Sequence, residues 1–385
     1  MKFEPSCSLE RIDQRVFEEG IITAWISSDA EDTCWDTFLH DIPLGQYQQS
    51  TIWARAKKVE GWKPLRVVFT SENIIVGGFQ VLVRSSWWGK IGYISKGPVI
   101  LPDRSTLSLY ATETLRKIAR KEGLWALIVQ PPDQCTQMSA KLAAAGFLHN
   151  VLIDVIEATW IVDLRGGFEE VEKRMRQTSR NKVRQAIKKG LTYREGEKED
   201  LDTFYELMSA TCRRQGVEPK PPDVQSFVAL WDASRRARCT RVSLVEYEGK
   251  PIAGDVCIMF GQTFTIYKKG WDSFKGNPNP NDFLWYEELK WASSRGYQYC
   301  DFVGFDMQMA IAMLRGEPTS EEQRRSRYEF FIHFGGKPRL LPEARVYFPN
   351  PAIRLAYSII FYKKIQRAKE KRRLVDQTIG LSRNV

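Results

Sequence analysis

The sequence predicts two mixed α/β domains in tandem, and three observations lead to this prediction. The chain has 385 residues, which exceeds the size at which a single hydrophobic core stops growing. Hydrophobic residues make up 43% of it and aromatic residues 12%, which is enough to fill two cores and too much for a disordered protein. Strands followed by a helix and a further strand are predicted twice along the chain. Because no residue-level repeat accompanies this order, the duplication is one of topology.

In the first half of the chain, short runs of β-branched and aromatic residues alternate with apolar residues at helical spacing. The runs predict strands at 64–69, 74–83, 91–99, 124–129 and 158–164. The helical spacing predicts helices at 106–121 and 136–145. Arg165-Gly166-Gly167 follows the last of these strands and is the expected hinge. The first domain is therefore predicted to span residues 1–164.

The second half repeats this order and ends in a basic segment. It predicts helices at 168–189, 200–214 and 282–295, and strands at 241–248, 253–259, 263–269 and 299–303. A second domain is therefore expected over residues 165–345. Lysines and arginines are dense in 357–374, which predicts a basic terminal helix within a separate tail at 346–385.

Charge and composition narrow the classes of function. The formal net charge is +10, from 57 basic and 47 acidic residues, which favours RNA, nucleotide diphosphates or anionic lipid surfaces as partners. The apolar runs fall short of the roughly 20 residues that a membrane helix needs, and the N-terminus lacks signal-peptide features. Seven cysteines without a Cys-x-x-Cys pair, together with only three histidines, indicate a reducing cytoplasm and no structural metal.

Two segments carry a family signature, namely 46–57, which reads QYQQSTIWARAK, and 93–99, which reads YISKGPV. They resemble the Fem family of aminoacyl-tRNA-dependent transferases, which add amino acids to peptidoglycan precursors. Further matches follow in the family order at 176–186, 217–221, 299–306 and 327–336. The resemblance implies two tandem GNAT-like acyltransferase domains and a reaction that uses no cofactor. It also implies aminoacyl-tRNA as donor and a UDP-linked or lipid-linked peptide precursor as acceptor.

Two lysines are expected to bind the diphosphate of the acceptor. Lys57 lies four residues after Trp53, so a helix would place both side chains on the same face. In the family a lysine at this spacing contacts the diphosphate, and Lys220 lies where relatives offer a second cation. The alternatives are a lysine whose stem merely covers a tryptophan and a rigid loop between two prolines. The resemblance places both lysines in a groove between the two domains.

A cluster of cations is expected to bind phosphate groups of the tRNA. The segment 176–186 resembles the basic helix that opens the second Fem domain, and the residues implied are Arg176, Arg180, Lys182 and Arg184. The alternative is a solvated helix face that serves solubility alone.

The chain departs from the family pattern at two positions. The family has a lysine that stabilises charge on the ester carbonyl, and Phe331 stands there instead. Gln130 occupies the place of a carboxylate before proline. We expect Lys268, or less readily His333, to supply the missing cation, although an exposed lysine at a strand end is the simpler interpretation. Tyr267 and Phe330 complete the predicted substrate-binding residues.

The reaction implied is attack of an amine on an activated aminoacyl ester. The protein must align the reactants and stabilise an oxyanion, so no Ser or Cys nucleophile is required. One alternative is an acyl-CoA-dependent N-acyltransferase in polysaccharide or envelope assembly, although its pyrophosphate-binding loop is not found in the sequence. The other is a non-catalytic protein that binds RNA or a membrane surface. The expected location is the cytoplasm, peripheral at the inner face of the membrane.

Overall fold

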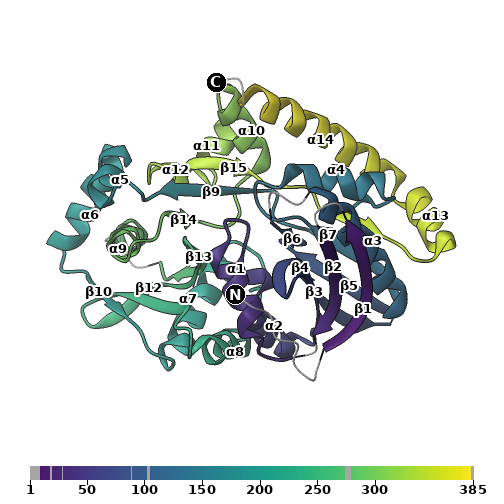
Figure 1. The fold of residues 1–385 in the computed structure, drawn as a ribbon. Coiled ribbons are helices and arrows are strands. Elements are labelled where there is room, and N and C mark those ends of the chain that lie inside the picture. Colours follow the sequence, from purple (N-terminus) through teal and green to yellow (C-terminus); the bar gives the residue numbers. More distant parts are fainter. Residues whose placement is uncertain are drawn as a thin grey trace. The chain divides into compact units, whose positions relative to one another are not determined.

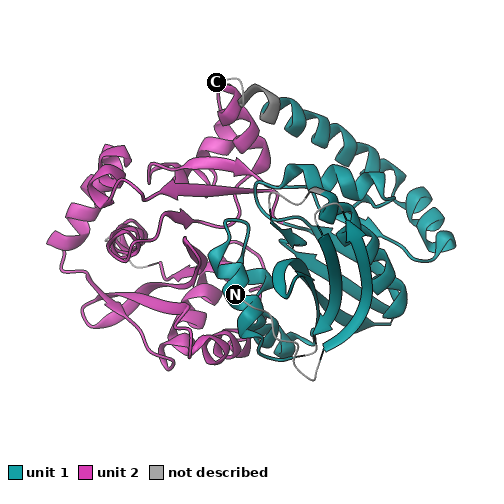
Figure 2. Cartoon of the chain, viewed as in Figure 1, with its two compact units in different colours: residues 1–155, 341–385 teal, residues 156–340 magenta. Residues whose placement is uncertain are grey.

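The computed structural model describes residues 9–17, 20–27, 29–87, 89–101, 105–273 and 279–382. The chain forms two compact units, one from residues 1–155 and 341–385 and the other from residues 156–340 (Figure 2). The division differs from the expected 1–164, 165–345 and 346–385. The strand at 158–163 pairs within the second unit, and the C-terminal segment packs on the first unit instead of forming a separate tail.

The sheet of the first unit has strand order β1-β2-β3-β4-β5-β7-β16-β8, with β6 paired to β4 (Figure 1). Adjacent strands in this sheet are antiparallel, except that β5 and β7 are parallel and are connected through α3. The strands are β1 (Leu9–Phe17), β2 (Gly20–Ser27), β3 (Lys63–Ser71), β4 (Ile74–Ser86), β5 (Gly89–Ser95), β6 (Val99–Ile100), β7 (Leu124–Gln130), β8 (Leu148–His149) and β16 (Arg345–Tyr347). The helices are α1 (Thr33–Asp41), α2 (Thr51–Lys57), α3 (Ser105–Lys121), α4 (Thr136–Ala144), α13 (Pro351–Ile360) and α14 (Tyr362–Ser382), with short 3₁₀ turns η1 (Tyr47–Gln49) and η2 (Lys58–Glu60).

Alternation along β7 divides the core of the first unit into two layers. Leu127 and Val129 join the cluster that includes residues of α3 and α4, whereas Ala126 and Ile128 join a second cluster on the other face. That second cluster contains Tyr357 of α13 with Ile365 of α14. The C-terminal helices therefore cover one face of this sheet.

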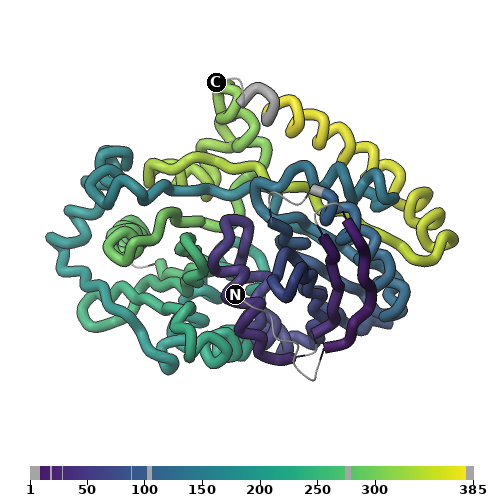
Figure 3. The backbone as a smooth tube through the Cα atoms, viewed as in Figure 1, coloured from purple at the N-terminus to yellow at the C-terminus, as the bar shows by residue number. Residues whose placement is uncertain are grey.

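The sheet of the second unit has strand order β10-β11-β12-β13-β14-β9-β15, in which β13 and β14 are parallel and α9 connects them. The strands are β9 (Ala158–Asp163), β10 (Thr192–Glu195), β11 (Thr240–Tyr247), β12 (Lys250–Phe260), β13 (Thr263–Trp271), β14 (Tyr299–Asp301) and β15 (Lys337–Leu340). The helices are α5 (Phe168–Arg174), α6 (Gln177–Lys188), α7 (Asp200–Arg214), α8 (Gln225–Ser234), α9 (Pro280–Ser294), α10 (Met307–Arg315), α11 (Glu321–Arg325) and α12 (Glu329–Ile332). The predicted topological duplication is confirmed, because β3-β4-β5-α3-β7 and β11-β12-β13-α9-β14 follow the same path (Figure 3).

Two long helices predicted from the sequence are each two helices in the structure. The helix expected at 168–189 breaks at Met175, whose extended backbone buries its side chain, and the next residue, Arg176, donates its backbone N–H to the carbonyl of His333. The basic helix expected at 357–374 breaks at Phe361, between α13 and α14. At Arg176 a tertiary contact turns the chain where the helical spacing alone continues.

Candidate active site

The signature segment at 46–57 holds the first unit together through Gln49. This side chain is fully buried, and its Nε2 donates to the carbonyl oxygens of Ser95 and Gln80 at 2.7 and 3.3 Å. Its Oε1 accepts from the backbone N–H of Gln80 at 2.7 Å. The two halves of the signature, in η1 and at the end of β5, are therefore joined by one amide. Much of the sequence pattern reflects this framework rather than ligand contacts.

The predicted geometry of Trp53 and Lys57 is present on α2. The Lys57 Nζ lies 4.6 Å from the centroid of the Trp53 ring, and its second contact is Glu60 Oε1 at 2.6 Å. Trp53 is buried and packs edge-on against Tyr47, with ring centroids 5.0 Å apart. The lysine is thus held in place beside a carboxylate that a phosphate group would have to displace. Its role in binding stays a prediction.

A buried ion pair beside the signature was missed by the sequence analysis. Lys96, whose backbone has φ of 60°, forms a salt bridge with Asp133, and both side chains are largely buried. Gln46 closes the arrangement, since its Nε2 donates to Asp133 Oδ2 at 2.8 Å. Gln130, which stands in the place of the family carboxylate, is buried, and its backbone oxygen accepts from the N–H of Gly97. The nearest carboxylate along the chain is therefore already neutralised by a lysine.

In the second unit, a bulge in β13 decides which of two adjacent lysines faces α9. Val256 pairs with Lys268, whereas the next residue of β12, Cys257, pairs with Ile266, so Tyr267 is the extra residue. Val256 belongs to the cluster formed with α7 and α8, and Tyr267 packs on the same cluster. The Lys268 Nζ lies 5.5 Å from the centroid of the Tyr267 ring. Lys268 was the expected residue, but this register favours its neighbour Lys269 as the source of the missing cation.

Lys269 pairs across the sheet with Asp255, and its ammonium lies among three aromatic rings. The distances from its Nζ to the ring centroids are 4.0 Å for Trp285, 4.9 Å for Phe331 and 5.1 Å for Phe330. Phe331 is the residue that stands in place of the family lysine. Lys269 thus brings a cation from β13 next to the ring that stands in place of the family lysine.

Burial lowers the pKa of Lys269 to about 7. Arg327 lowers it further, while the carboxyl groups of Asp255 and Asp282 oppose the shift. Both protonation states of Lys269 are therefore populated near neutral pH, which is the property of a group that exchanges protons in a reaction.

The predicted residue His333 lies in a polar cluster with α6 and α9. The hydroxyl of Ser179 donates to Asp282 Oδ1 at 2.7 Å, and His333 Nδ1 lies 3.3 Å from the same hydroxyl oxygen. Burial, followed by the charge of Arg176, lowers the pKa of His333. Ser179 is fully buried, and its hydroxyl donates its hydrogen bond to the carboxylate of Asp282 instead of to His333. The three residues are therefore not arranged as a Ser-His-Asp nucleophile.

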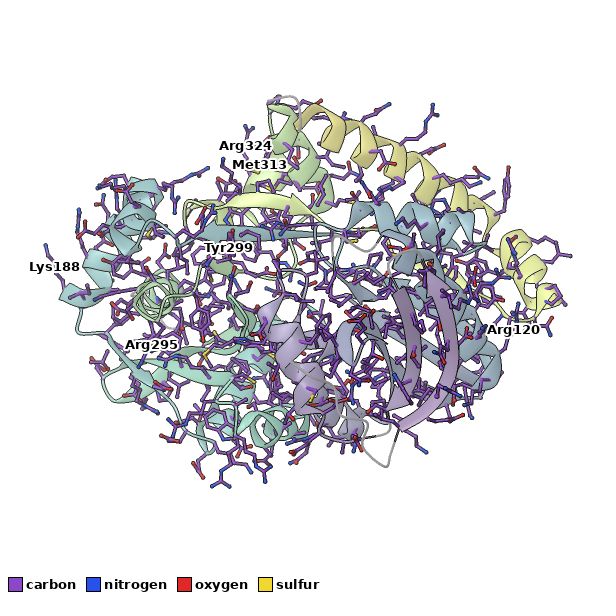
Figure 4. All side chains as sticks on the ribbon, viewed as in Figure 1. Arg120, Lys188, Arg295, Tyr299, Met313 and Arg324 are labelled. Carbon is purple, nitrogen blue, oxygen red and sulfur yellow. The ribbon has the colours of Figure 1, made fainter. Side chains whose placement is uncertain are left out.

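The four predicted cations around α6 differ in what they contact. Arg176 pairs with Glu329 at 2.6 Å, and the Lys182 Nζ lies 3.7 Å from Asp282 Oδ2. Arg180 donates to the backbone oxygen of Glu172 at 3.1 Å and is half-buried. The remaining cation, Arg184, is exposed and donates to Asn181 within its own helix, at 3.3 Å. Lys188 extends away from the end of α6 (Figure 4). Among the residues that the structure describes, Arg184 and its exposed neighbour Lys188 form no ion pair, unlike Arg176 and Lys182, and are therefore the cations of α6 best placed to bind phosphate.

Asp255, Cys257 and Glu288 place their ligand atoms within 4.8 Å of one another in the core of the second unit. The donor set fits a metal ion poorly, because a guanidinium already faces it, with Arg241 Nε 3.7 Å from Glu288 Oε2. Tyr193 also donates to Glu288 Oε1 at 2.8 Å. Burial, followed by the charge of Glu288, raises the pKa of Asp255. The cluster is therefore a buried acid pair balanced by basic groups.

The remaining predicted segments have mixed outcomes. Lys220 is exposed in the loop between α7 and α8. It belongs to the second unit and Lys57 to the first, so their pairing stays a prediction. Gly304, shortly after β14, has a φ of 80°, a conformation that glycine adopts without strain. Phe331 is buried, with its ring centroid 5.3 Å from that of Trp285.

Two family models match the chain. The FemAB family model covers residues 30–223, just over half of the 385 residues. The chain belongs to the FemAB family. An acetyltransferase (GNAT) domain model matches residues 173–309 and includes β13 and α9, the elements that hold Lys269 and Trp285. The mixed α/β fold and the Fem relationship predicted from the sequence are confirmed.

Curated relatives and solved structures agree with this assignment. The chain is 27% identical over 237 residues to the lipid II:glycine glycyltransferase of Staphylococcus saprophyticus, covering 58% of this chain and 57% of that protein. It is 28% identical over 227 residues to that of Staphylococcus aureus, covering 56% and 53%. The match thus spans less than two thirds of these relatives' lengths. The crystal structure of FemX shares the fold, with a TM-score of 0.72 at 20% identity, covering 83% of this chain and 97% of that one.

Proposed function

We propose that this FemAB family protein is an acyltransferase that moves an aminoacyl group from aminoacyl-tRNA to an amine of a peptidoglycan precursor. The observation that carries the proposal is the ammonium of Lys269, 4.9 Å from the centroid of the Phe331 ring. The cation that the family places on the later helix is thereby provided from a neighbouring strand. Relatives named as glycyltransferases that act on lipid II support the class of donor and acceptor.

Lys269 acts in this proposal as the group that takes a proton from the acceptor. The acceptor amine arrives as an ammonium, and neutral Lys269 accepts one proton from it. The free amine then attacks the ester carbonyl, and the C–N bond forms as the carbonyl becomes an oxyanion. Lys269, now a cation, stabilises that oxyanion. Collapse breaks the ester C–O bond, the leaving tRNA oxygen takes the second proton of the nitrogen, and Lys269 releases its proton to solvent.

Other residues take binding roles. Lys57 and Lys220 neutralise the diphosphate of the acceptor, each as a point charge. Arg184 and Lys188 contact phosphate groups of the tRNA. His333, with its lowered pKa, serves as a neutral hydrogen-bonding group beside Ser179. Tyr267 and Phe330 supply apolar contacts for the substrate. The reaction needs no cofactor because the ester is already activated.

The direct test is transfer of labelled amino acid from charged tRNA to an acceptor. The purified full chain is incubated with charged tRNA and either a UDP-linked muropeptide or lipid II, and labelled precursor is isolated. Transfer to either acceptor supports the proposal, and loss of transfer in Lys269→Met supports the assigned residue. A chain that transfers to neither acceptor, and whose melting temperature is raised by acetyl-CoA, would instead be a CoA-dependent N-acyltransferase.

A further inference from the structure

The helix α13 presents an apolar face to solvent. Leu355, Ile359 and Ile360 are 62%, 67% and 72% exposed, and Ala352 and Ala356 lie exposed beside them. On a helix, residues three and four apart are neighbours, so these five side chains form one continuous surface. A continuous surface of exposed apolar side chains is unusual for a helix that faces solvent.

The orientation of α13 is fixed from its other side. Tyr357 is buried, and its hydroxyl donates to the backbone oxygen of His149 at 2.6 Å while accepting from the N–H of Val151 at 3.0 Å. Its ring packs against Phe348, with centroids 4.7 Å apart. The helix therefore cannot turn its apolar face inward without breaking these contacts. The exposure of the apolar residues is a built feature of the fold.

Cations follow directly on the next helix. Tyr362, at the start of α14, is 59% exposed, and Lys363 and Lys364 after it are exposed as well. Further exposed cations are Arg354, Arg367, Lys369 and Arg373. The exposed acids of this stretch are Glu370 and Asp376, and Asp376 is paired with Arg372 at 2.6 Å. We call the exposed apolar residues 355, 359, 360 and 362, with the cations 354, 363, 364 and 367, the C-terminal docking surface.

We propose that the C-terminal docking surface binds the protein to the surface of an anionic lipid bilayer. Exposed Leu and Ile side chains enter the boundary between headgroups and acyl chains, and the neighbouring Lys and Arg side chains attract the anionic headgroups. Among the described helices none is both long enough and apolar enough to cross a bilayer, so this contact lies on the membrane without spanning it.

Other occupants fit the surface less well. RNA would use the cations, but its backbone gains nothing from a row of aliphatic side chains, and its bases stack on aromatic rings. A second copy docked through the same face would bring two positively charged surfaces together, because a two-fold interface pairs a patch with itself. The combination of aliphatic side chains and cations is what an anionic bilayer complements.

If the proposed function holds, docking on a membrane also distinguishes between the two classes of acceptor, lipid-linked and nucleotide-linked. An enzyme held on the membrane meets a lipid-linked precursor at raised local concentration, whereas a nucleotide-linked precursor gains nothing from it. We therefore assign the lipid-linked form as the acceptor. The docking itself stands independently of the transfer reaction.

Vesicle flotation of the purified full chain tests docking. The probes are vesicles of phosphatidylcholine alone and with phosphatidylglycerol. We expect binding to the anionic vesicles that weakens with salt. The variant L355S/I359S/I360S should lose at least about tenfold in partitioning, and each charge reversal at Lys363 and Lys364 at least about fivefold. The matched controls V59S/I74S and K250E change exposed residues elsewhere and should bind like the wild type.

Each contrary outcome has its own meaning. Binding to anionic vesicles that persists in L355S/I359S/I360S, or no binding by the wild type, overturns docking. Self-association that this variant abolishes assigns the surface to a second copy instead, and tRNA binding lost only in the charge reversals assigns it to RNA. Unchanged melting temperatures show that the variants are folded. Transfer to the UDP-linked muropeptide but not to lipid II in vesicles overturns the acceptor assignment alone, whereas transfer to neither acceptor refutes the proposed function and leaves docking intact.

Discussion

Replacement of Lys269 by Met should change the shape of the pH–rate profile, not only its height. The wild type needs a neutral Lys269 and a protonated acceptor, so kcat/KM should rise with unit slope to about pH 7 and then stay flat up to the pKa of the acceptor amine. K269M lacks the base and reacts only with acceptor that is already neutral. Its log rate should therefore climb with unit slope through the range where the wild type is flat.

The lowered pKa of Lys269 sets the size of this effect. At pH 7.5 about three quarters of a group with a pKa of about 7 is neutral, against roughly 0.1% of an ordinary lysine, a difference of several hundredfold. Loss of a general base costs about 10²–10⁴ in rate, so K269M should fall in that range on the wild-type plateau. K269R keeps a cation but cannot give up its proton, and it should not restore the flat region. The matched control K268M changes the neighbouring lysine and should keep the wild-type profile.

Single-turnover transfer from charged tRNA at a series of pH values is the assay. If the K269M and wild-type profiles have the same shape, Lys269 takes no proton in the reaction. A full rate in K269R would mean that the residue acts as a fixed cation only. Either result refutes the role assigned here.

Four further predictions follow from the same geometry. Because the pKa of Lys269 is lowered on folding, the unfolded state holds an extra proton between about pH 7 and 10, and the free energy of unfolding should rise with pH over this range. The rise is at most ~5 kcal/mol, because the residue is only half-buried. Urea denaturation of the wild type and K269M at several pH values checks this, and a parallel pH dependence of the two proteins would contradict it. Q49A leaves buried partners on Gln80 and Ser95 unsatisfied and should lower the unfolding free energy by about 3 kcal/mol in the same assay. K57M keeps the packing on Trp53 but should raise KM for the acceptor about tenfold at unchanged kcat, with E60Q as the control that does not raise it. R184A should weaken tRNA binding and reduce its salt dependence by about one counterion, and an unchanged slope of affinity against salt would count against this contact.

Local pattern was sufficient for most of the fold. The predicted strand at 64–69 and the predicted helix at 200–214 correspond to β3 and α7, because each has a clear period of its own. The domain boundary was wrong by one strand, since only pairing with β14 and β15 assigns β9 to the second unit. Strand partners depend on residues more than a hundred positions away, and local spacing does not contain them.

Only part of the candidate site could be predicted from the sequence, because its arrangement also depends on how distant strands pair. The residues of the signature were located, but Gln49 proved to be framework, which a motif alone does not distinguish from ligand contact. Lys268 was the lysine expected to supply the missing cation, and the bulge at Tyr267, which decides which of the two lysines faces α9, leaves no mark in the local sequence. A second cation in place of the lysine missing at position 331 was expected. That Lys269, and not Lys268, lies beside Phe331 became visible only in the cross-strand register.

The path of the chain through the two units has a consequence for its synthesis. Residues 156–340 form one uninterrupted stretch, whereas the first unit is completed by β16, which lies between β7 and β8. The earlier-made unit thus cannot close its sheet until the last part of the polypeptide has left the ribosome, and the later-made unit is ready to fold before it. During that interval Ala126 and Ile128 lack their partners on α13 and α14, so a chaperone that shields nascent apolar strands would be needed most at this stage of translation.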